Sequence, residues 1–421
     1  MRDLATVYRR RDFGAFVSAR FLATVAMQVQ SLAIGWQIYN IENTALALGF
    51  VGLCQFAPMF LLTLPAGEVT DRFDQRRVLS LAYAAEGLCG VLFVLLSLLA
   101  PKNALLFYGV LVLFGAARGF SGPAGSSLLP FLVPLEKLPR SIALNSSVFT
   151  TAVIAGPAIG GLVYLAGPIF TYALASLCFL FAAGLTIVLG GRRIVREKTD
   201  ASRLERVLEG IRFVRDRPIV LGAISLDLFA VLLGGAVALL PIYARDILHV
   251  GPLGLGVLRS SQAVGAATMA FTLARAPIER QAGTRMFAAV AAFGIATIVF
   301  GISHNVYLSF AALFVTGASD MISVFIRSAL IQYSTPDPMR GRVSAVSMLF
   351  IGASNELGEF ESGITASWFG TVPAVVLGGL GTLGVVGVWM WLFPPLRTVD
   401  RLREVEPPTA AMDETIAAKP V

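Results

Sequence analysis

The sequence predicts an all-α membrane protein with twelve transmembrane helices in two six-helix pseudo-repeats. Its composition argues against a water-soluble domain, because 56% of its 421 residues are hydrophobic and only 14% are charged, against about 25% charged in an average soluble domain. Two further observations set the architecture. The apolar residues form long stretches separated by short polar loops, and one long hydrophilic segment divides the chain near its middle.

A stretch of about 20 apolar residues is long enough to cross a bilayer as a helix. The chain offers such stretches in regular succession. The first is too long for a signal peptide and has no small-residue cleavage site, so we expect it to remain attached. The expected spans are 13–39, 45–64, 78–100, 104–128, 141–165, 168–189, 219–243, 254–273, 286–303, 306–333, 343–368 and 372–393.

The distribution of basic residues predicts how the chain is oriented. Nearly all lysines and arginines fall in the two tails and in alternate loops, whereas the opposite loops carry only Lys102 and Arg245. Short loops rich in these residues stay in the cytoplasm, so we expect both termini there. This scatter also argues against nucleic-acid binding, despite the net charge of +7, because no basic patch or stripe forms. The arginines left within the spans or near their ends are Arg20, Arg118, Arg259 and Arg327.

The hydrophilic segment gives the domain organisation. We expect an N-terminal six-helix half over residues 1–190, a cytoplasmic linker over 191–218, a C-terminal half over 219–393 and a disordered polar tail over 394–421. In the linker, Ser202 and Glu205 have the spacing of a capping box, and apolar residues follow on one helical face. This predicts an amphipathic helix on the membrane surface or against the bundle. A partner-binding helix is the alternative.

The two halves share an internal echo. At an offset of 208 residues, the stretch 71–77 matches 279–285. At an offset of 202, the glycine-containing stretch 156–161 matches 358–363, and Gly115 matches Gly317. The same offset places Arg118 opposite Asp320. Internal repeats of this kind predict two halves with a binding site at their interface.

A charged turn that begins with glycine connects the second and third spans. Gly67 lets two helices approach closely, and Asp71 can face a helix N-terminus. Three arginines in the turn can stay with cytoplasmic water and anionic lipid. We expect a latch that biases a conformational equilibrium; an ordinary positively charged loop is the alternative. The latch residues are Gly67, Asp71, Arg72, Arg76 and Arg77.

This turn resembles the signature loop of the major facilitator superfamily of transporters, and the resemblance covers nearly the whole chain. Arg118 and its neighbours look like the superfamily's helix-4 arginine motif. Gly156, Pro157, Gly160 and Gly161 look like the core of its antiporter motif, which implies export. The motif also has a physical basis, since proline can kink a helix and glycines permit close packing; generic glycine packing is the alternative. Ala143 and Ala152 depart from the full motif, which has glycine there.

The first ninety or so residues resemble one branch more closely. The run from Thr44 to Pro58, together with Asp74 in the signature loop, is similar to the branch that contains the bacterial enterobactin exporter and multidrug efflux proteins. This resemblance implies an efflux protein of the bacterial inner membrane. It also implies a role in siderophore export or multidrug resistance.

Ionisable residues within the spans are the candidates for proton coupling, because each is costly in hydrocarbon unless it is paired, hydrated or neutralised. Glu356 and Glu359 can share a helical face, where repulsion and burial favour protonation of at least one. Arg118 and Asp320 can pair between the halves. A static structural ion pair is the alternative for each acid. The full set is Arg118, Asp320, Asp227, Glu86, Glu356 and Glu359.

Amide and aromatic side chains within the spans are the candidates for substrate binding. Such a mixture suits a partly apolar ligand that forms hydrogen bonds. It permits an amphipathic compound, a sugar or a siderophore, and the same groups can simply bond neighbouring helices. The candidates are Gln28, Gln30, Trp36, Gln37, Asn145, Gln332 and Asn355.

The expected function is secondary active transport, with proton-coupled export of a siderophore-like or amphipathic small molecule by alternating access. We expect neither an enzyme nor a cofactor or metal site, because zinc, phosphate-loop and nucleophile motifs are absent from the sequence. The expected partners are a small molecule, protons and membrane lipids, with no nucleic acid, and we expect a monomer. A solute importer is one alternative. A lipid-moving or sensory membrane protein that does not transport is the other.

Overall fold

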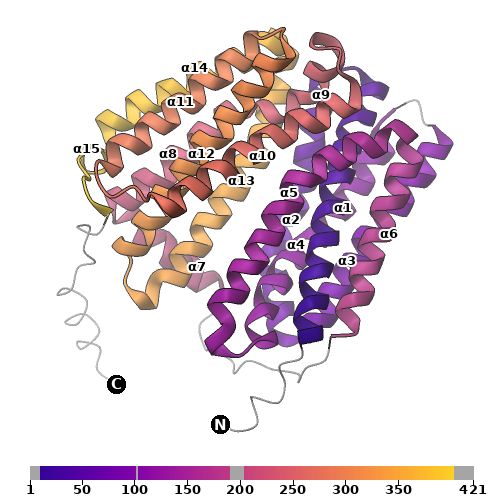
Figure 1. Ribbon diagram of the computed structural model, residues 1–421, viewed down its shortest axis with the longest axis horizontal. Coiled ribbons are helices and arrows are strands. Elements are labelled where there is room, and N and C mark those ends of the chain that lie inside the picture. The colour runs from indigo at the N-terminus through magenta and orange to yellow at the C-terminus, as the bar shows by residue number, and fades with distance from the viewer. Residues whose placement is uncertain (1–9, 101–102, 190–202, 403–421) are drawn as a thin grey trace.

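The computed structural model describes residues 10–100, 103–189 and 203–402, and within them the chain is helical throughout, with no strand. Figure 1 shows the helices as two adjacent groups. The N-terminal group comprises α1 (Arg10–Glu42), α2 (Ala45–Arg72), α3 (Gln75–Leu99), α4 (Leu105–Leu132), α5 (Leu138–Val163) and α6 (Pro168–Ile187). The short α7 (Arg203–Arg215) precedes the C-terminal group of α8 (Pro218–Gly234), α9 (Leu240–Ile242), α10 (Gly251–Arg275), α11 (Ala282–Ile302), α12 (Val306–Ser334), α13 (Asp337–Phe369), α14 (Thr371–Leu392) and α15 (Pro394–Arg397).

Twelve helical segments have the length of membrane spans, as expected. Ten of them, within the described residues, are also apolar enough to cross a membrane by composition alone. The other two are α10 and α13, which are less apolar because they carry charged residues such as Arg259 on α10 and Glu356 and Glu359 on α13. The charged residues that lower the hydropathy of these two helices therefore include two of the residues expected to take part in proton coupling, Glu356 and Glu359.

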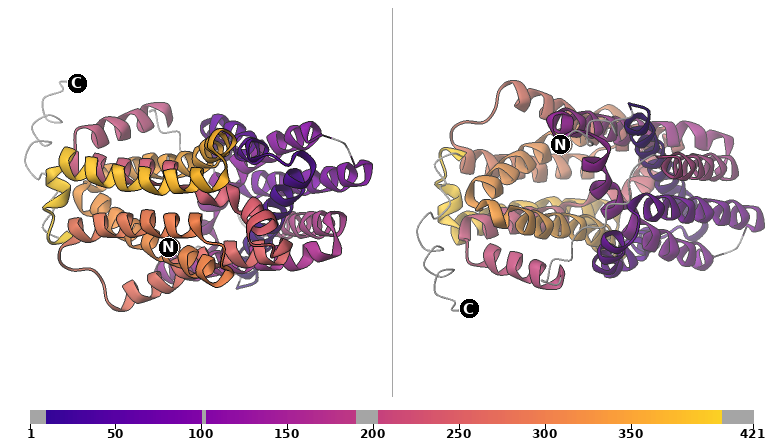
Figure 2. Two further views of the ribbon diagram at one scale, coloured as in Figure 1. Left: turned by 90° about the horizontal axis from the view of Figure 1, so that it is seen from above. Right: turned by 90° about the horizontal axis from the view of Figure 1, so that it is seen from below.

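The helix contacts repeat between the two halves. In the N-terminal half α1 contacts α5 and α6, α2 contacts α4, and α3 contacts α4 and α6. In the C-terminal half α8 contacts α13 and α14, α10 contacts α12, and α11 contacts α12 and α14, which is the same pattern. Between the halves, α2 lies against α13 and α5 lies against α10, again as a symmetric pair. The two views of Figure 2 show the halves side by side.

Glycines at equivalent positions make equivalent contacts. A Cβ at Gly156 would meet the side chain of Gln28 on α1, and one at Gly358 would meet the backbone of Leu232 on α8. Likewise a Cβ at Gly161 would lie 3.1 Å from Cα of Gly256 on α10, across the interface between the halves. Gly363 makes the matching approach to α2 at Gly49. The structure therefore bears out the offset of 202 residues in its packing.

The two ends of the bundle differ in how closely the halves meet. We call the end at which α7 lies the α7 end, and the end with the π-helical turn η4 (Tyr243–Ile247) the η4 end. At the η4 end the halves touch through Gly161 and Gly256 and through the side chain of Arg245. Toward the α7 end, every residue of α5 from 142 to 151 is exposed or half-buried. Because these ten positions cover all faces of a helix, the halves are apart here.

The charged turn after α2 is shorter than the sequence suggested. We expected the second span to end at residue 64, but α2 continues to Arg72 and contains Pro58 and Pro65. Gly67 is therefore buried within a helix. Only Phe73 and Asp74 separate α2 from α3. Asp74 caps α3 by accepting a hydrogen bond from the backbone N–H of Arg76 at 3.0 Å.

The seventh span is broken, although we expected it to be continuous from 219 to 243. α8 ends at Gly234, and the chain continues as the 3-10 turn η3 (Ala236–Leu239), the short α9 and η4. Adjacent Gly234 and Gly235 explain the break, because glycine destabilises a helix interior. A Cβ at Gly234 would lie 2.7 Å from Oγ1 of Thr382, so α14 approaches the backbone there.

The linker contains a helix, α7, that contacts α13 and α8. Residues 191–202, including Ser202 of the expected capping box, lie outside the described residues, as does the tail beyond residue 402. The expected disorder of the tail and the exact domain boundaries therefore stay predictions.

Candidate functional site

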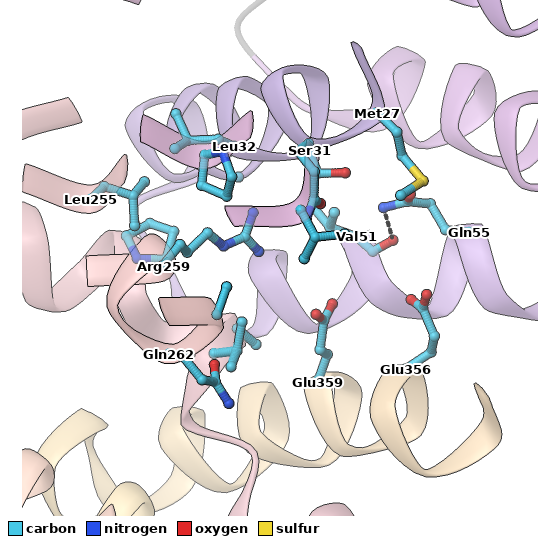
Figure 3. A pocket seen from close by; sticks show the side chains of 18 of the residues that line it. Met27, Ser31, Leu32, Val51, Gln55, Leu255, Arg259, Gln262, Glu356 and Glu359 are labelled. Carbon is cyan, nitrogen blue, oxygen red and sulfur yellow. Dashed lines mark hydrogen bonds between the residues drawn. The ribbon is translucent and has the colours of Figure 1, made fainter. Parts of the chain in front are cut away.

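A cavity of about 370 Å³ lies between the two halves. Both halves contribute to it through α1, α2, α4 and α5 on one side and α10, α12, α13 and the broken seventh span on the other. Its polar and charged lining residues are Gln28, Ser31, Gln55, Arg118, Arg259, Gln262, Asp320, Glu356 and Glu359, and its apolar ones include Met27, Leu32, Leu48, Val51, Pro157, Pro241 and Leu255. Figure 3 shows part of this lining.

Arg118 makes the polar contact that joins the halves inside the cavity. Its Nη1 donates to Oε1 of Gln55 on α2 at 3.2 Å and lies 3.5 Å from Oε1 of Glu356 on α13. Glu356, rather than the expected Asp320, is therefore its acidic partner in this conformation. Asp320 lines the same cavity and forms no ion pair with any other described residue within 4 Å.

Arg259 and Glu359 lie on opposite sides of the cavity. Arg259 extends from α10, and Glu359 points inward from α13 beside Glu356 (Figure 3). Within the part of the chain that the structure describes, neither forms a hydrogen bond or an ion pair within 4 Å. A free guanidinium and a free carboxylate in the middle of a membrane protein are costly unless water, a proton or a ligand offsets the cost. The cavity therefore offers one cationic and one anionic side chain to a polar ligand group.

Two glycines allow pairs of helices to cross closely at the glutamines that line the cavity. A Cβ at Gly115 on α4 would clash with the backbone of Gln55 on α2, and one at Gly317 on α12 would clash with that of Gln262 on α10. The two glycines are equivalent in the repeat. These close helix crossings bring Gln55 and Gln262 to the cavity from the two halves, although neither glutamine was predicted to lie in the site.

The other two acids of the expected coupling set lie away from the cavity. Asp227 on α8 forms an ion pair with Arg327 on α12, and both side chains are almost fully buried. Glu86 on α3 is also buried, and its Oε1 has no hydrogen-bond partner among the described residues. Neither lines the cavity. The alternative of a static ion pair fits the surroundings of Asp227.

Of the seven expected substrate-binding residues, Gln28 lines the cavity. Gln30 is fully buried toward α3, Trp36 is also buried, and Gln37 donates to Oγ of Ser97 at 3.1 Å. Asn355 is exposed and donates to the carbonyl of Ile351. Asn145 is half-buried and Gln332 is exposed. Apart from Gln28, none of the seven expected residues lines the cavity.

Of the latch residues, Arg76 and Arg77 lie in the first turn of α3, and Gly67, Asp71 and Arg72 lie in the last turns of α2. Arg76 pairs with Asp74 at 3.0 Å and donates to the carbonyl of Leu189, just beyond α6, at 2.6 Å. Arg72 lies 3.8 Å from Glu68 on an exposed surface, and Arg77 is exposed. The side chain of Asp71 lies outside what the structure describes, so its expected contact with a helix N-terminus stays a prediction.

The electrostatics of Asp74 follow from this geometry. Burial by itself raises the pKa of its carboxyl, but hydrogen bonds and the charge of Arg76 more than offset this and hold the pKa below its ordinary value. The carboxylate is therefore ionised at neutral pH, where it caps α3 and holds Arg76.

The comparison with protein families is decisive for the class of this protein. The model of the transmembrane secretion effector family, within the major facilitator superfamily, matches residues 5–418. The chain belongs to this family. It is therefore a transporter and not an enzyme, which sets aside the alternative of a membrane protein that does not transport.

Curated relatives match over the full length. The chain is 26% identical over 98% of both chains to a protein of Shigella boydii named enterobactin exporter EntS. It is 25% identical over the same share to the protein of that name in Escherichia coli O1:K1.

Solved structures share the fold. A mutant of the nucleoside transporter NupG aligns with a TM-score of 0.74 at 10% identity, over 91% of this chain and all of that one. A bacterial homologue of the human lysosomal transporter Spinster, in an inward-facing and occupied conformation, aligns with a TM-score of 0.70 at 14% identity, over 93% and 96% of the two chains. At these identities the likeness concerns the fold alone.

Proposed function

We propose that this transporter is a proton-coupled exporter that moves a siderophore-like or amphipathic small molecule out of the cytoplasm in exchange for protons. The observation that carries the proposal is the cavity between the halves, with the unpaired Glu359 and Arg259 facing each other among apolar side chains. The apolar lining suits the body of such a molecule, and the glutamines and Ser31 supply hydrogen bonds.

The direction of transport rests on three observations. The basic loops favour a cytoplasmic α7 end, with both termini on that side. The halves are apart toward that end, so the cavity can load from the cytoplasm. Pro157 and Gly161 of the antiporter-like motif lie where α5 meets α10, at the contact that must open for release on the other side. The name of the curated relatives, enterobactin exporter, also favours outward movement.

Glu359 is the first candidate for the proton carrier. Its carboxylate lies in the cavity within the membrane and has no hydrogen-bond or ion-pair partner within 4 Å among the described residues, so protonation removes a buried negative charge. Bound protons and a bound substrate then compete for the same space, which couples one to the other. Asp320 is the second candidate, because it lines the same cavity without a partner. Glu356 is held by Arg118 and is better suited to joining the halves.

The experiment is substrate-driven proton movement in inverted membrane vesicles that contain the chain, with siderophores and amphipathic drugs as candidate substrates. We expect Glu359→Gln to abolish the proton flux and Asp320→Asn to reduce it. Glu361→Gln is the matched control, because Glu361 lies on the same helix but accepts a hydrogen bond from Thr365 at 2.7 Å and does not line the cavity. A full proton flux in the Glu359→Gln variant would exclude Glu359 as the carrier.

An importer with the same cavity is the alternative. The sign of the proton gradient separates the two directions: in inverted vesicles that contain an exporter, a lumen more acidic than the outside should drive accumulation of labelled substrate inside. Accumulation driven by the opposite gradient would favour import. We further propose that the protein acts as a monomer in the inner membrane, since the cavity is complete within one chain.

A further inference from the structure

Helix α7 presents two different faces to its surroundings. Gly210, Phe213 and Val214 are buried. On the other side, Leu208 is 43% exposed and Ile211 is 39% exposed. These two side chains belong to a helix outside the transmembrane bundle, and their position beside basic residues is what distinguishes this face.

The buried face fixes α7 to the start of α13. Glu209 forms an ion pair with Arg342, and a Cβ at Gly210 would lie 2.9 Å from the carbonyl oxygen of Arg342. Phe213 and Val214 belong to one hydrophobic cluster with Val343 and Val346 of α13. Because α13 also carries Glu356 and Glu359, a force on α7 reaches the helix that lines the cavity.

The outward face combines apolar and basic residues. At about 100° per residue, Leu208, Ile211, Arg212 and Arg215 lie on the side opposite Gly210. Both arginines are exposed, as is Asp216 at the edge of this face. Figure 2 shows α7 at the periphery of the bundle beside the C-terminal half. Apolar residues beside arginines on a peripheral helix are typical of a helix that lies in the membrane interface.

We propose that the outward face of α7 binds anionic phospholipid headgroups and that this contact positions α13. Arg212 and Arg215 pair with the phosphates, for which the planar guanidinium is well suited. Leu208 and Ile211 lie at the boundary with the acyl chains. The proposal assigns α7 a lipid-binding role that transport itself does not require.

The test measures which lipid lies next to α7. Leu208→Trp places a fluorophore on the outward face, and the chain is reconstituted in nanodiscs of phosphatidylcholine and phosphatidylglycerol in which only one of the two lipids is brominated. We expect brominated phosphatidylglycerol to quench the added fluorescence more strongly, since each arginine enriches the anionic lipid roughly fivefold. The parent chain, with its native tryptophans, supplies the background.

Charge variants provide the control. Arg212→Gln with Arg215→Gln should make the two brominated lipids quench equally. Arg275→Gln with Arg285→Gln removes two exposed arginines from α10 and α11 and should leave the preference intact. Equal quenching while Arg212 and Arg215 are present would overturn the proposal, and so would the absence of quenching by either lipid.

Hydrogen exchange tests the coupling to α13. Phosphatidylglycerol should slow exchange at residues 339–347 when Arg212 and Arg215 are present and have no such effect in their double variant. If the exchange rate at these residues in the unmodified chain were the same with and without phosphatidylglycerol, the proposed coupling of α7 to α13 would be overturned. Neither measurement needs a transported substrate, so failure here is distinct from failure of the proposed export function.

Discussion

At the scale of single residues, acids with the same sequence signal have different surroundings. Asp227 and Glu359 both lie within apolar spans, but Asp227 is paired with Arg327 in the interior of the C-terminal half. Glu359 faces the cavity and forms no ion pair within 4 Å with another described residue. A paired buried acid stabilises the fold only while its partner remains, whereas an unpaired acid in a cavity is free to exchange protons.

Asp227→Asn should therefore destabilise the protein. The substitution leaves the charge of Arg327 buried without its counterion, which costs about 3–5 kcal/mol. We expect a clear loss of thermal stability in detergent, with Asp320→Asn as the control that removes an acid from the cavity. If Asp227→Asn retained normal stability and altered only the pH dependence of transport, Asp227 would belong to the coupling machinery instead.

We expect the contribution of Asp74 to the stability of the fold to depend on pH. Because its folded-state pKa is lowered, the stabilisation is present above the ordinary value of about 3.9 and is lost as the pH falls through the lowered folded value. At neutral pH, Asp74→Ala should cost about 1 kcal/mol through loss of the helix cap. Thermal unfolding at neutral pH and in strong acid checks this, with Glu279→Ala as an exposed control. A difference that persisted unchanged in acid would contradict this account.

The sequence predicted the types of residue in the site better than their positions. Arg118, Asp320, Glu356 and Glu359 stood out as charges in apolar spans, and all four line the cavity. Arg259 gave the same signal but was not assigned a role. Neutral polar residues were harder, because Gln28 and Gln30 are equally polar and two positions apart, yet only Gln28 faces the cavity. Which face of a helix is central depends on its neighbours, and hydropathy does not encode those neighbours.

At the scale of elements, the helices were predictable and their interruptions were not. The apolar stretches located the spans because hydrocarbon demands long runs of apolar residues. Hydropathy averaged over many residues did not reveal the break at Gly234 and Gly235. It also placed the end of α2 too early, because the last turns of this helix are charged. Local backbone chemistry decides such features, and it contributes little to mean hydropathy.

The close contact between α5 and α10 predicts that a larger residue at Gly161 opens the η4 end. A Cβ at Gly161 would lie 2.5 Å from the carbonyl oxygen of Pro252, so Gly161→Val must push the two helices apart at the η4 end. Overpacking of this kind costs about 1–3 kcal/mol, all of it in conformations closed at that end. Ser31→Cys in the cavity, with the native cysteines replaced, should then react faster with an impermeant thiol reagent applied from the η4 side.

The matched control for that experiment is Gly184→Val on α6, where a Cβ would meet nothing within 4 Å. It should leave the labelling rate unchanged. Labelling that was equally slow in the Gly161→Val variant would mean that this contact does not hold the η4 end closed.

At the scale of the whole molecule, the repeat in the sequence becomes a symmetric interface. Gly161 and Gly363, separated by 202 residues, each bring a helix of one half against the other half. The charges break this symmetry, because Arg118 in the first half corresponds to Asp320 in the second. A symmetric frame allows the halves to rock about a central site, while the asymmetric charges give that site a chemistry of its own.

Arg245 is the main polar tie between the halves at the η4 end. Its guanidinium lies 4.1 Å from the ring centroid of Tyr39 and donates to Oδ1 of Asn40 at 3.0 Å and to Asn43, while Asp246 holds it from the same segment at 2.8 Å. Removing these contacts should cost the closed conformation about 1.5–3 kcal/mol, a shift of roughly tenfold or more toward opening at the η4 end.

Spin labels at the η4 ends of α1 and α10 test the role of Arg245. The distance between them is measured in Arg245→Ala and in the unmodified chain. The variant should show a larger open population than the unmodified chain, and transport should slow because the conformation open to the α7 end is then less occupied. Arg285→Ala, at an exposed arginine on α11, should change neither quantity. An unaltered distance distribution in Arg245→Ala would show that the other contacts between the halves, among them the hydrogen bond from Tyr39 to Asp246 and the close approach of Gly161 to α10, are enough to keep this end shut.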